Sequence, residues 1–173
     1  MIEEHVIMFM DVHNYSIAVS GLPEGPSGVL QEMYETLGDI IVEHKGEILK
    51  YMGDAILCLF LKGSESNAVE CALKLRKAFN KMGGWKGLPG DPELEIGIGF
   101  GPVSIGIFGH RTYQQRDIIG EEINRVATIG HHRGIAITEG MYEHIKNDFN
   151  TNSLPDIFVK WQEEPLKVWE IIR

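Results

Sequence analysis

Two acidic residues lie at the ends of apolar segments, where a buried carboxylate needs a partner. Asp11 is near the end of the run HVIMFMDV (5–12), and Asp54 follows Gly53 between the apolar halves of EILKYMGDAILCLFL (47–61). Burying a carboxylate is costly unless it is hydrogen-bonded, paired or bound to metal. Taken singly, each acid is adequately explained as a turn residue. If the two strand ends adjoin, the pair predicts a divalent-metal site of the kind that serves phosphoryl transfer.

A second set of polar residues occurs in RDIIGEEINRVATIG (116–130). Asp117 stands in an otherwise apolar strand pattern, and the segment then becomes helical. Asn124 and Thr128 are four residues apart in that helix, so they share one face. This arrangement indicates either a loosely packed surface helix or one wall of a site.

Two further features could serve a phosphorylated ligand. The segment HNYSIA (13–18) follows Asp11 and is expected to enter a helix. The first amide groups of a helix, together with its dipole, suit phosphate oxygens. Lys50 lies four residues before Asp54 in a strand pattern. A lone lysine in a strand is usually a solvated edge residue, so its meaning depends on its neighbours.

The elements that must position these residues are mixed helices and strands. Helical spacing is found over 29–45, 65–82, 121–130 and 139–148. Single strand patterns are found at 5–12, 114–119 and 134–138. Residues 47–61 predict a hairpin that turns at Gly53-Asp54, and residues 94–109 predict two strands that turn near Gly101-Pro102. The segments DIFVKWQ and PLKVWEII predict a C-terminal hairpin. Strands and helices without strict alternation predict an α+β fold, a mixed α/β sandwich. The glycines at 97, 99 and 106 predict close approach of another segment.

Composition excludes several classes of function. A chain of 173 residues suits one domain, residues 1–173. A net charge of −9 argues against nucleic-acid binding. The apolar runs are too short for membrane insertion, and the N-terminus has acids where a signal peptide has bases. Cys58 and Cys71 lack metal-ligand spacing, so we expect reduced core thiols and a cytoplasmic location.

Four segments in order make the chain resemble the catalytic domain of class III nucleotide cyclases: FMDVHNYS, GEILKYMGDAILCLF, IGIGFGPVSIGIFG and RDIIGEEIN. The resemblance runs from about residue 5 to the C-terminus. It implies a ferredoxin-like core with a central, mostly antiparallel sheet flanked by helices. It also implies ATP as the substrate, and a homodimer that pairs head to tail and builds each site from both chains. Two Mg²⁺ or Mn²⁺ ions are implied on Asp11 and Asp54.

The same resemblance assigns roles to other residues. Lys50 and Asp117 correspond to the pair that reads the purine, and the Lys/Asp combination is similar to that of adenine-selecting members, because lysine donates to N1 and aspartate accepts from the 6-amino group. Asn124 corresponds to the residue that orients the ribose. The family's Gly-Phe-Thr near the phosphates is represented by Asn14, Tyr15 and Ser16, and one of its two phosphate-binding lysines by Lys160, with Gln162 where the second is expected.

One departure from the family pattern bears on activity. The family's arginine that stabilises charge on the transferring phosphate corresponds to Thr128. Arg125 is about 100° around the helix from Asn124, in the wrong phase. Arg133 or His132, in the segment that follows, could reach in instead. Without a substitute cation we expect low activity.

Three functions remain open from the sequence. The leading hypothesis is an adenylate cyclase that converts ATP to cyclic AMP and pyrophosphate. The alternative is a degenerate cyclase-like domain that binds nucleotide and regulates without turnover. A palm-type polymerase or cyclic-dinucleotide synthase ranks last, because Lys50 and Asp117 fit a cyclase better. His131-His132 is interpreted as a solvated helix end, and the tryptophans as packing or interface residues.

Overall fold

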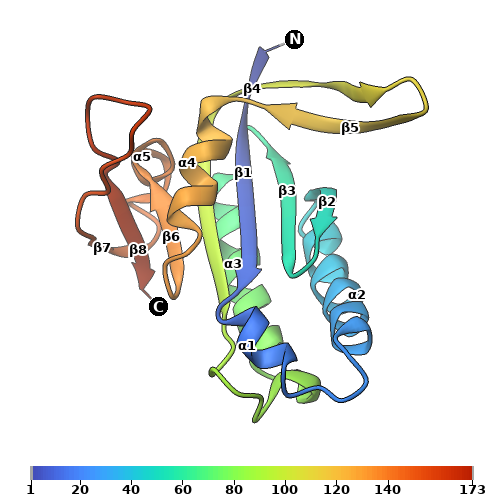
Figure 1. The fold of residues 1–173 in the computed structure, drawn as a ribbon. Coiled ribbons are helices and arrows are strands. Elements are labelled where there is room, and N and C mark those ends of the chain that lie inside the picture. Colours follow the sequence, from blue (N-terminus) through green and yellow to red (C-terminus); the bar gives the residue numbers. More distant parts are fainter. Residues whose placement is uncertain (1, 173) are drawn as a thin grey trace.

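The computed structural model describes residues 2–172, which form one eight-stranded sheet with helices on both faces (Figure 1). The strands are β1 Ile2–Val12, β2 Glu47–Met52, β3 Ala55–Leu61, β4 Leu94–His110, β5 Tyr113–Ile119, β6 Ile135–Thr138, β7 Asn150–Ser153 and β8 Val168–Ile172. The helices are α1 Tyr15–Val19, α2 Ser27–Glu43, α3 Glu65–Phe79, α4 Glu121–Ile129 and α5 Glu139–Ile145, with a 3₁₀ turn η1 at Gly83–Trp85. The strand order is β2-β3-β1-β4-β6-β8-β7, and β5 pairs with β4. The β4–β6 pairing is parallel and the other pairings between these strands are antiparallel, as the predicted α+β class requires.

The central strand β1 separates two layers of side chains. Met8 and Met10 belong to the large core shared with α2, α3 and α5. Ile7 and Phe9 face the opposite way and pack with Val126 of α4. Because side chains alternate along a strand, Asp11 continues the Ile7 and Phe9 series and lies on the α4 face of the sheet.

Helix α4 lies close to β4 because glycines face it. A Cβ at Gly97 would collide with the carbonyl oxygen of Val126, and one at Gly99 would collide with the side chains of Glu122 and Val126. The predicted close approach is therefore present at these two positions. At Gly106 the three atoms nearest to an added Cβ all belong to the flexible ring of Phe108, so the feature that made Gly97 and Gly99 necessary, a helix packed against the strand, has no counterpart there among these nearest atoms.

The prediction of two strands in residues 94–109 is wrong, because β4 continues from Leu94 to His110 without a turn. One edge pairs with β1 as far as Ser104, while the other pairs first with β6 and then, from Ser104 onward, with β5. Ile96 donates its amide hydrogen to Gly134 on the β6 side, so by alternation the nitrogen of Pro102 also faces that side. Pro102 falls between the two partners, so its missing amide hydrogen removes no ladder bond.

The predicted C-terminal hairpin is also wrong in its first strand. Residues of DIFVKWQ form only an isolated bridge between Ile157 and Leu166. The partner of β8 on that side is β7, whose sequence NTNS has the composition of a polar loop. Because β7 is an edge strand with mostly exposed side chains, it needs no apolar alternation, and backbone pairing with β8 defines it.

The other predicted elements are present with shifted ends. Two helices end earlier than predicted, at Phe79 instead of residue 82 and at Ile145 instead of residue 148. Every helix within residues 2–172 is too short or too polar to traverse a lipid bilayer.

Candidate active site

The two predicted metal-binding acids meet at one end of the sheet. Asp11 is the penultimate residue of β1, and Asp54 occupies the turn between β2 and β3. Asp54 Oδ2 accepts the amide hydrogen of Val12 at 3.2 Å, which places its carboxylate beside the end of β1. The hydroxyl of Tyr34 donates to the carbonyl of Gly53 and holds the turn from the α2 side. The juxtaposition proposed from the sequence is therefore present in the fold.

The environment of Asp11 fits a divalent cation. Burial raises the pKa of its carboxyl to about 6, His131 opposes the rise, and the neighbouring Glu95 and Asp54 add to it. Its Oδ1 atom is buried and has no hydrogen-bond partner within residues 2–172. Carboxylate oxygens gathered without a cation are unfavourable, and they are the ligands that Mg²⁺ and Mn²⁺ prefer. The residues present therefore suit such an ion.

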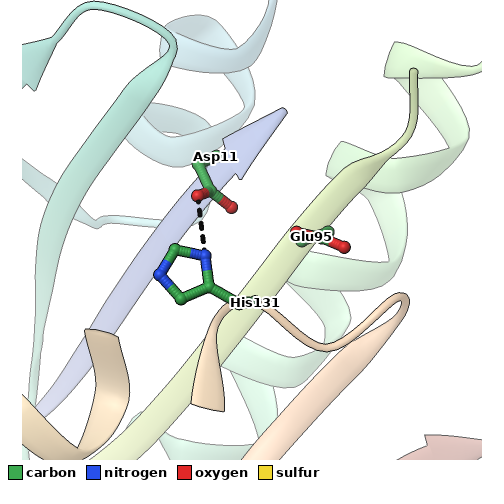
Figure 2. Close-up of side chains that lie close together, drawn as sticks. All are labelled: Asp11, Glu95 and His131. Atoms are coloured by element: carbon green, nitrogen blue, oxygen red, sulfur yellow. Dashed lines mark ion pairs between the residues drawn. The ribbon is translucent and has the colours of Figure 1, made fainter. Parts of the chain in front are cut away.

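Glu95 and His131 lie with Asp11 in a group of possible metal ligands, the acidic cluster (Figure 2). Sequence reasoning missed both residues. Glu95 lies directly opposite Asp11 in the β1–β4 register. The Nδ1 atom of His131 lies 3.2 Å from Asp11 Oδ2. His131 follows the end of α4 and its side chain is largely exposed, as its interpretation as a solvated helix end requires, but that interpretation did not anticipate the contact with Asp11. One signal was available for Glu95: it begins the alternation that continues with Gly97 and Gly99, which places an acid on the α4 face.

His13 also approaches the cluster. Its Nδ1 atom lies 2.8 Å from Glu95 Oε1. The approach lacks hydrogen-bond geometry, so Glu95 Oε1 remains buried without a hydrogen-bond partner among the described residues. Two carboxylate oxygens of the cluster, Asp11 Oδ1 and Glu95 Oε1, therefore have no hydrogen-bond partner among the described residues.

Lys50 and Asp117 form a second functional pair. They belong to β2 and β5, and their Nζ and Oδ2 atoms are 2.6 Å apart. Both side chains are partly buried, and the other carboxylate oxygen of Asp117 accepts the amide hydrogen of Ile118 at 2.8 Å. The structure thus brings together a donor and an acceptor that the sequence places 67 positions apart. A fixed ammonium beside a fixed carboxylate can read a planar ring that offers both an acceptor and a donor.

Asn124 and Thr128 lie on α4, as predicted. The side chain of Asn124 is exposed and that of Thr128 is partly exposed. The hydroxyl of Thr128 donates to the carbonyl of Asn124 at 2.7 Å. Its hydrogen is therefore engaged within the helix, and this position supplies no positive charge.

Nearby basic residues do not replace the missing arginine within one chain. Arg125 binds Glu121 at 2.6 Å and Glu122 at 3.2 Å. Arg133 binds Asp91 and Glu93 at 3.2 and 2.7 Å. His132 lies 3.5 Å from Glu170. The expectation that Arg133 or His132 could reach in is not met in this arrangement, because both face other carboxylates.

The remaining predicted residues differ in how they are placed. Asn14 adopts the left-handed conformation with φ 55° and donates from Nδ2 to Gly90 at 2.7 Å, so asparagine serves where the family has glycine. The pKa of Tyr15 is raised by burial and, to a smaller extent, by the nearby Asp54 and Tyr34. Ser16 is exposed in the first turn of α1. Lys160 is exposed and forms no hydrogen bond or ion pair in the described part of the chain.

Comparison with known proteins gives a consistent assignment. Residues 1–172 match the family described as the adenylate and guanylate cyclase catalytic domain. An adenylate cyclase of Anabaena cylindrica is 27% identical over 180 residues, which cover 95% of this chain and 36% of that relative. The chain therefore spans about a third of that protein's length.

Two solved structures share the fold. The adenylyl cyclase CyaB from P. aeruginosa superposes with a TM-score of 0.91 at 21% identity, covering 100% of this chain and 95% of that chain. The guanylyl cyclase Cya2 superposes with a TM-score of 0.89 at 24% identity, covering 99% of this chain and 92% of that chain. At these identities the likeness establishes the architecture only.

Proposed function

Because this chain belongs to the adenylate and guanylate cyclase catalytic domain family, we propose that residues 1–173 act as one catalytic domain that converts ATP to 3′,5′-cyclic AMP and pyrophosphate. The observation that carries the proposal is the meeting of Asp11 and Asp54, through the 3.2 Å hydrogen bond from Val12 to Asp54. Two carboxylates at one sheet end, with an oxygen left unpartnered, form the expected cradle for divalent ions.

Asp11 and Asp54 would hold two Mg²⁺ or Mn²⁺ ions. When bound, such ions lower the pKa of the ribose 3′-hydroxyl and neutralise triphosphate charge. The 3′-oxygen then forms a bond to the α-phosphorus in line with the bond that breaks to pyrophosphate. The contribution of the chain is mainly positioning and fixed charge. Asn14, Tyr15, Ser16 and Lys160 are the proposed contacts for the phosphates.

The preference for adenine is proposed from Lys50 and Asp117. The lysine would donate to N1, and the aspartate would accept from the 6-amino group. Guanine presents a donor at N1 and a carbonyl acceptor at C6. The lysine would then face a donor and the aspartate would face an acceptor, so neither could form its hydrogen bond. The proposal is supported by the 2.6 Å separation of the two partly buried groups, which puts a donor and an acceptor side by side. The name of the Anabaena relative agrees with this choice.

We further propose a homodimer in which each site draws on both chains, with Asn124 orienting the ribose. His131, just beyond the C-terminal end of α4, contacts Asp11 of the same chain. Asn124 lies seven residues earlier, which is about 10 Å along a helix axis. A ribose held beside the metal ions therefore needs an asparagine from elsewhere. A second copy that places its α4 against this sheet end would supply it.

A second candidate function is a domain that binds nucleotide without turnover, and Thr128 favours it. Loss of an arginine aimed at transition-state charge costs about 10³-fold or more in comparable phosphoryl transfers. Arg125 and Arg133 are held by carboxylates in this chain. Retention of Lys50, Asp117 and both metal acids opposes this candidate, because a scaffold has no physical need for all four.

The deciding experiment is turnover of Mn²⁺-ATP and Mn²⁺-GTP at high protein concentration, with mass-spectrometric detection of cyclic nucleotide. The control is Asp54→Asn, prepared identically. We expect slow formation of cyclic AMP, more than of cyclic GMP, and none with the control. Tight metal-dependent ATP binding in calorimetry without any product would support the second candidate. Absence of both product and binding would contradict both.

A further inference from the structure

The cluster of Asp11, Glu95 and His131 combines two carboxylates with an imidazole that contacts Asp11 at 3.2 Å. One oxygen each from Asp11 and Glu95 and one ring nitrogen of His131 lie within 4.8 Å of one another. The three residues come from β1, β4 and the turn after α4 (Figure 2). All three belong to a single chain, so this group exists without a nucleotide and without a second subunit.

Glu95 is the unusual member of this group. Its side chain is only 4% exposed, and its Oε1 atom, which lies 2.8 Å from His13 Nδ1, has no partner in hydrogen-bond geometry within residues 2–172. The Oδ1 atom of Asp11, its cross-strand neighbour, is also unpartnered among the described residues. Two adjoining carboxylates in this condition repel each other and lose solvation. A cation between them removes both penalties, whereas the imidazole of His13 approaches only Glu95 and leaves Asp11 Oδ1 without a hydrogen-bond partner among the described residues.

We propose that Asp11, Glu95 and His131 form a one-chain site that binds a divalent transition-metal ion such as Mn²⁺ before nucleotide arrives. This inference deepens the proposed function and rests on it for the role of Asp11. It goes further by making Glu95 and His131 metal ligands. Asp54, across the turn, would then serve the nucleotide-bound state.

The ligand chemistry predicts which ion the site favours. Mg²⁺ prefers oxygen ligands in near-ideal octahedral geometry and retains its waters. Imidazole nitrogen suits transition metals, and affinity for the divalent ions rises from Mn²⁺ to Cu²⁺ and falls again at Zn²⁺. His131 should therefore add affinity for Mn²⁺ and little for Mg²⁺. The nucleotide-free chain is expected to prefer Mn²⁺, and this preference should depend on one histidine.

The test is Mn²⁺ binding to the chelator-treated, nucleotide-free full chain, followed by electron paramagnetic resonance of the unbound ion. Wild type is compared with His131→Ala, Glu95→Gln and the neighbouring control His132→Ala. We expect His131→Ala and Glu95→Gln to weaken Mn²⁺ binding by about 10- to 100-fold, the range already seen for outer-shell partners. The control should bind as wild type does. Competition with Mg²⁺ should displace Mn²⁺ more easily from His131→Ala than from wild type.

Several outcomes separate this inference from the proposed function. Circular dichroism and thermal unfolding check that each variant is folded, and His131→Asn provides a second variant at a largely exposed position. Mn²⁺ binding that survives changes at both residue 131 and residue 95 but is lost in Asp54→Asn would overturn the inference and leave the two-aspartate site standing. Binding that depends on His131, in a chain that makes no cyclic nucleotide, would uphold the inference and contradict the proposed enzyme.

Discussion

At the scale of single residues, the surroundings of Asp11 oppose the ionisation of its carboxyl group. Burial raises its pKa to about 6, and Glu95 and Asp54 lie beside it with the same charge. Because the folded-state pKa of Asp11 is raised from 3.8 to about 6, stability falls as the pH rises through this interval, and the full loss is present above pH 6. At pH 8 without metal, this residue therefore opposes folding, although His131 offsets part of the cost.

Asp11→Asn should consequently stabilise the metal-free protein. In EDTA at pH 8 we expect a gain of about 1 kcal/mol, which corresponds to about 2–4 °C in Tm for a chain of this length. Asp156→Asn, at an exposed acid, is the control and should leave Tm unchanged. Differential scanning calorimetry measures both. A lower Tm in Asp11→Asn would show that the contact with His131 outweighs the repulsion among the acids.

If the proposed reaction takes place, we expect Thr128 to limit its rate, because this position supplies no positive charge. Thr128→Arg should increase the rate of cyclic AMP formation by about tenfold or more, because a cation aimed at developing phosphate charge is worth far more than that in related reactions. Ala127→Arg places the same charge about 100° away around α4 and should have no such effect. Initial rates with Mn²⁺-ATP provide the measurement. An equal change in both variants would mean that added charge, and not its position, is responsible.

At the scale of elements, the packing of α4 against β4 positions both His131 and Asn124. The helix approaches closely because β4 presents glycine toward it, and a side chain at Gly97 would meet the backbone of Val126. Backbone cannot yield as a flexible side chain can. A side chain at position 97 would therefore both displace α4 from β4 and reduce the stability of the fold.

Gly97→Ala should destabilise the fold by about 1–3 kcal/mol, the usual cost of overpacking. It should also weaken Mn²⁺ binding, because α4 carries His131 toward Asp11. Gly28→Ala, in the first turn of α2 where an added Cβ would meet open space, should be neutral or slightly stabilising. Urea titrations compare the two variants. A stable Gly97→Ala chain with normal Mn²⁺ binding would contradict this account of α4.

At the scale of the whole molecule, the proposed homodimer implies that one chain holds two partial sites. Asp11 and Asp54 form the acidic half, while Lys50 and Asp117 form the half that would read the base. Asn124 precedes His131, the residue that contacts Asp11, by seven positions, which is about 10 Å along a helix axis. Two copies arranged head to tail would join each acidic half to the other chain's base-reading half.

This arrangement predicts complementation between inactive chains. Asp54→Asn and Asn124→Ala should each be inactive alone. Mixed after dissociation at equal amounts, half of the dimers would be hybrids with one intact site of two, so about a quarter of wild-type activity should return for a symmetric pair. Sedimentation velocity confirms that dimers have formed. No recovery in such mixed dimers would show that each site lies within one chain.

Much of the site could be predicted from the sequence because its cues are local. An acid at the end of an apolar run and a Gly-Asp step between two apolar runs determine where Asp11 and Asp54 stand on their strands. Local hydrophobic spacing likewise determined the α+β class, the hairpin at 47–61 and the existence of the helices. The left-handed conformation at Asn14 agrees with the tolerance of asparagine for it.

The tertiary structure decided what depends on register between distant strands. The β1–β4 register places Glu95 opposite Asp11, and the packing of α4 then brings His131 to the same carboxylate. The continuity of β4 past Pro102 and the pairing of the polar strand β7 also depend on which neighbours are present at each edge. Periodicity records which face of an element is buried, but hydrogen-bonded partners far along the chain determine which side chains meet.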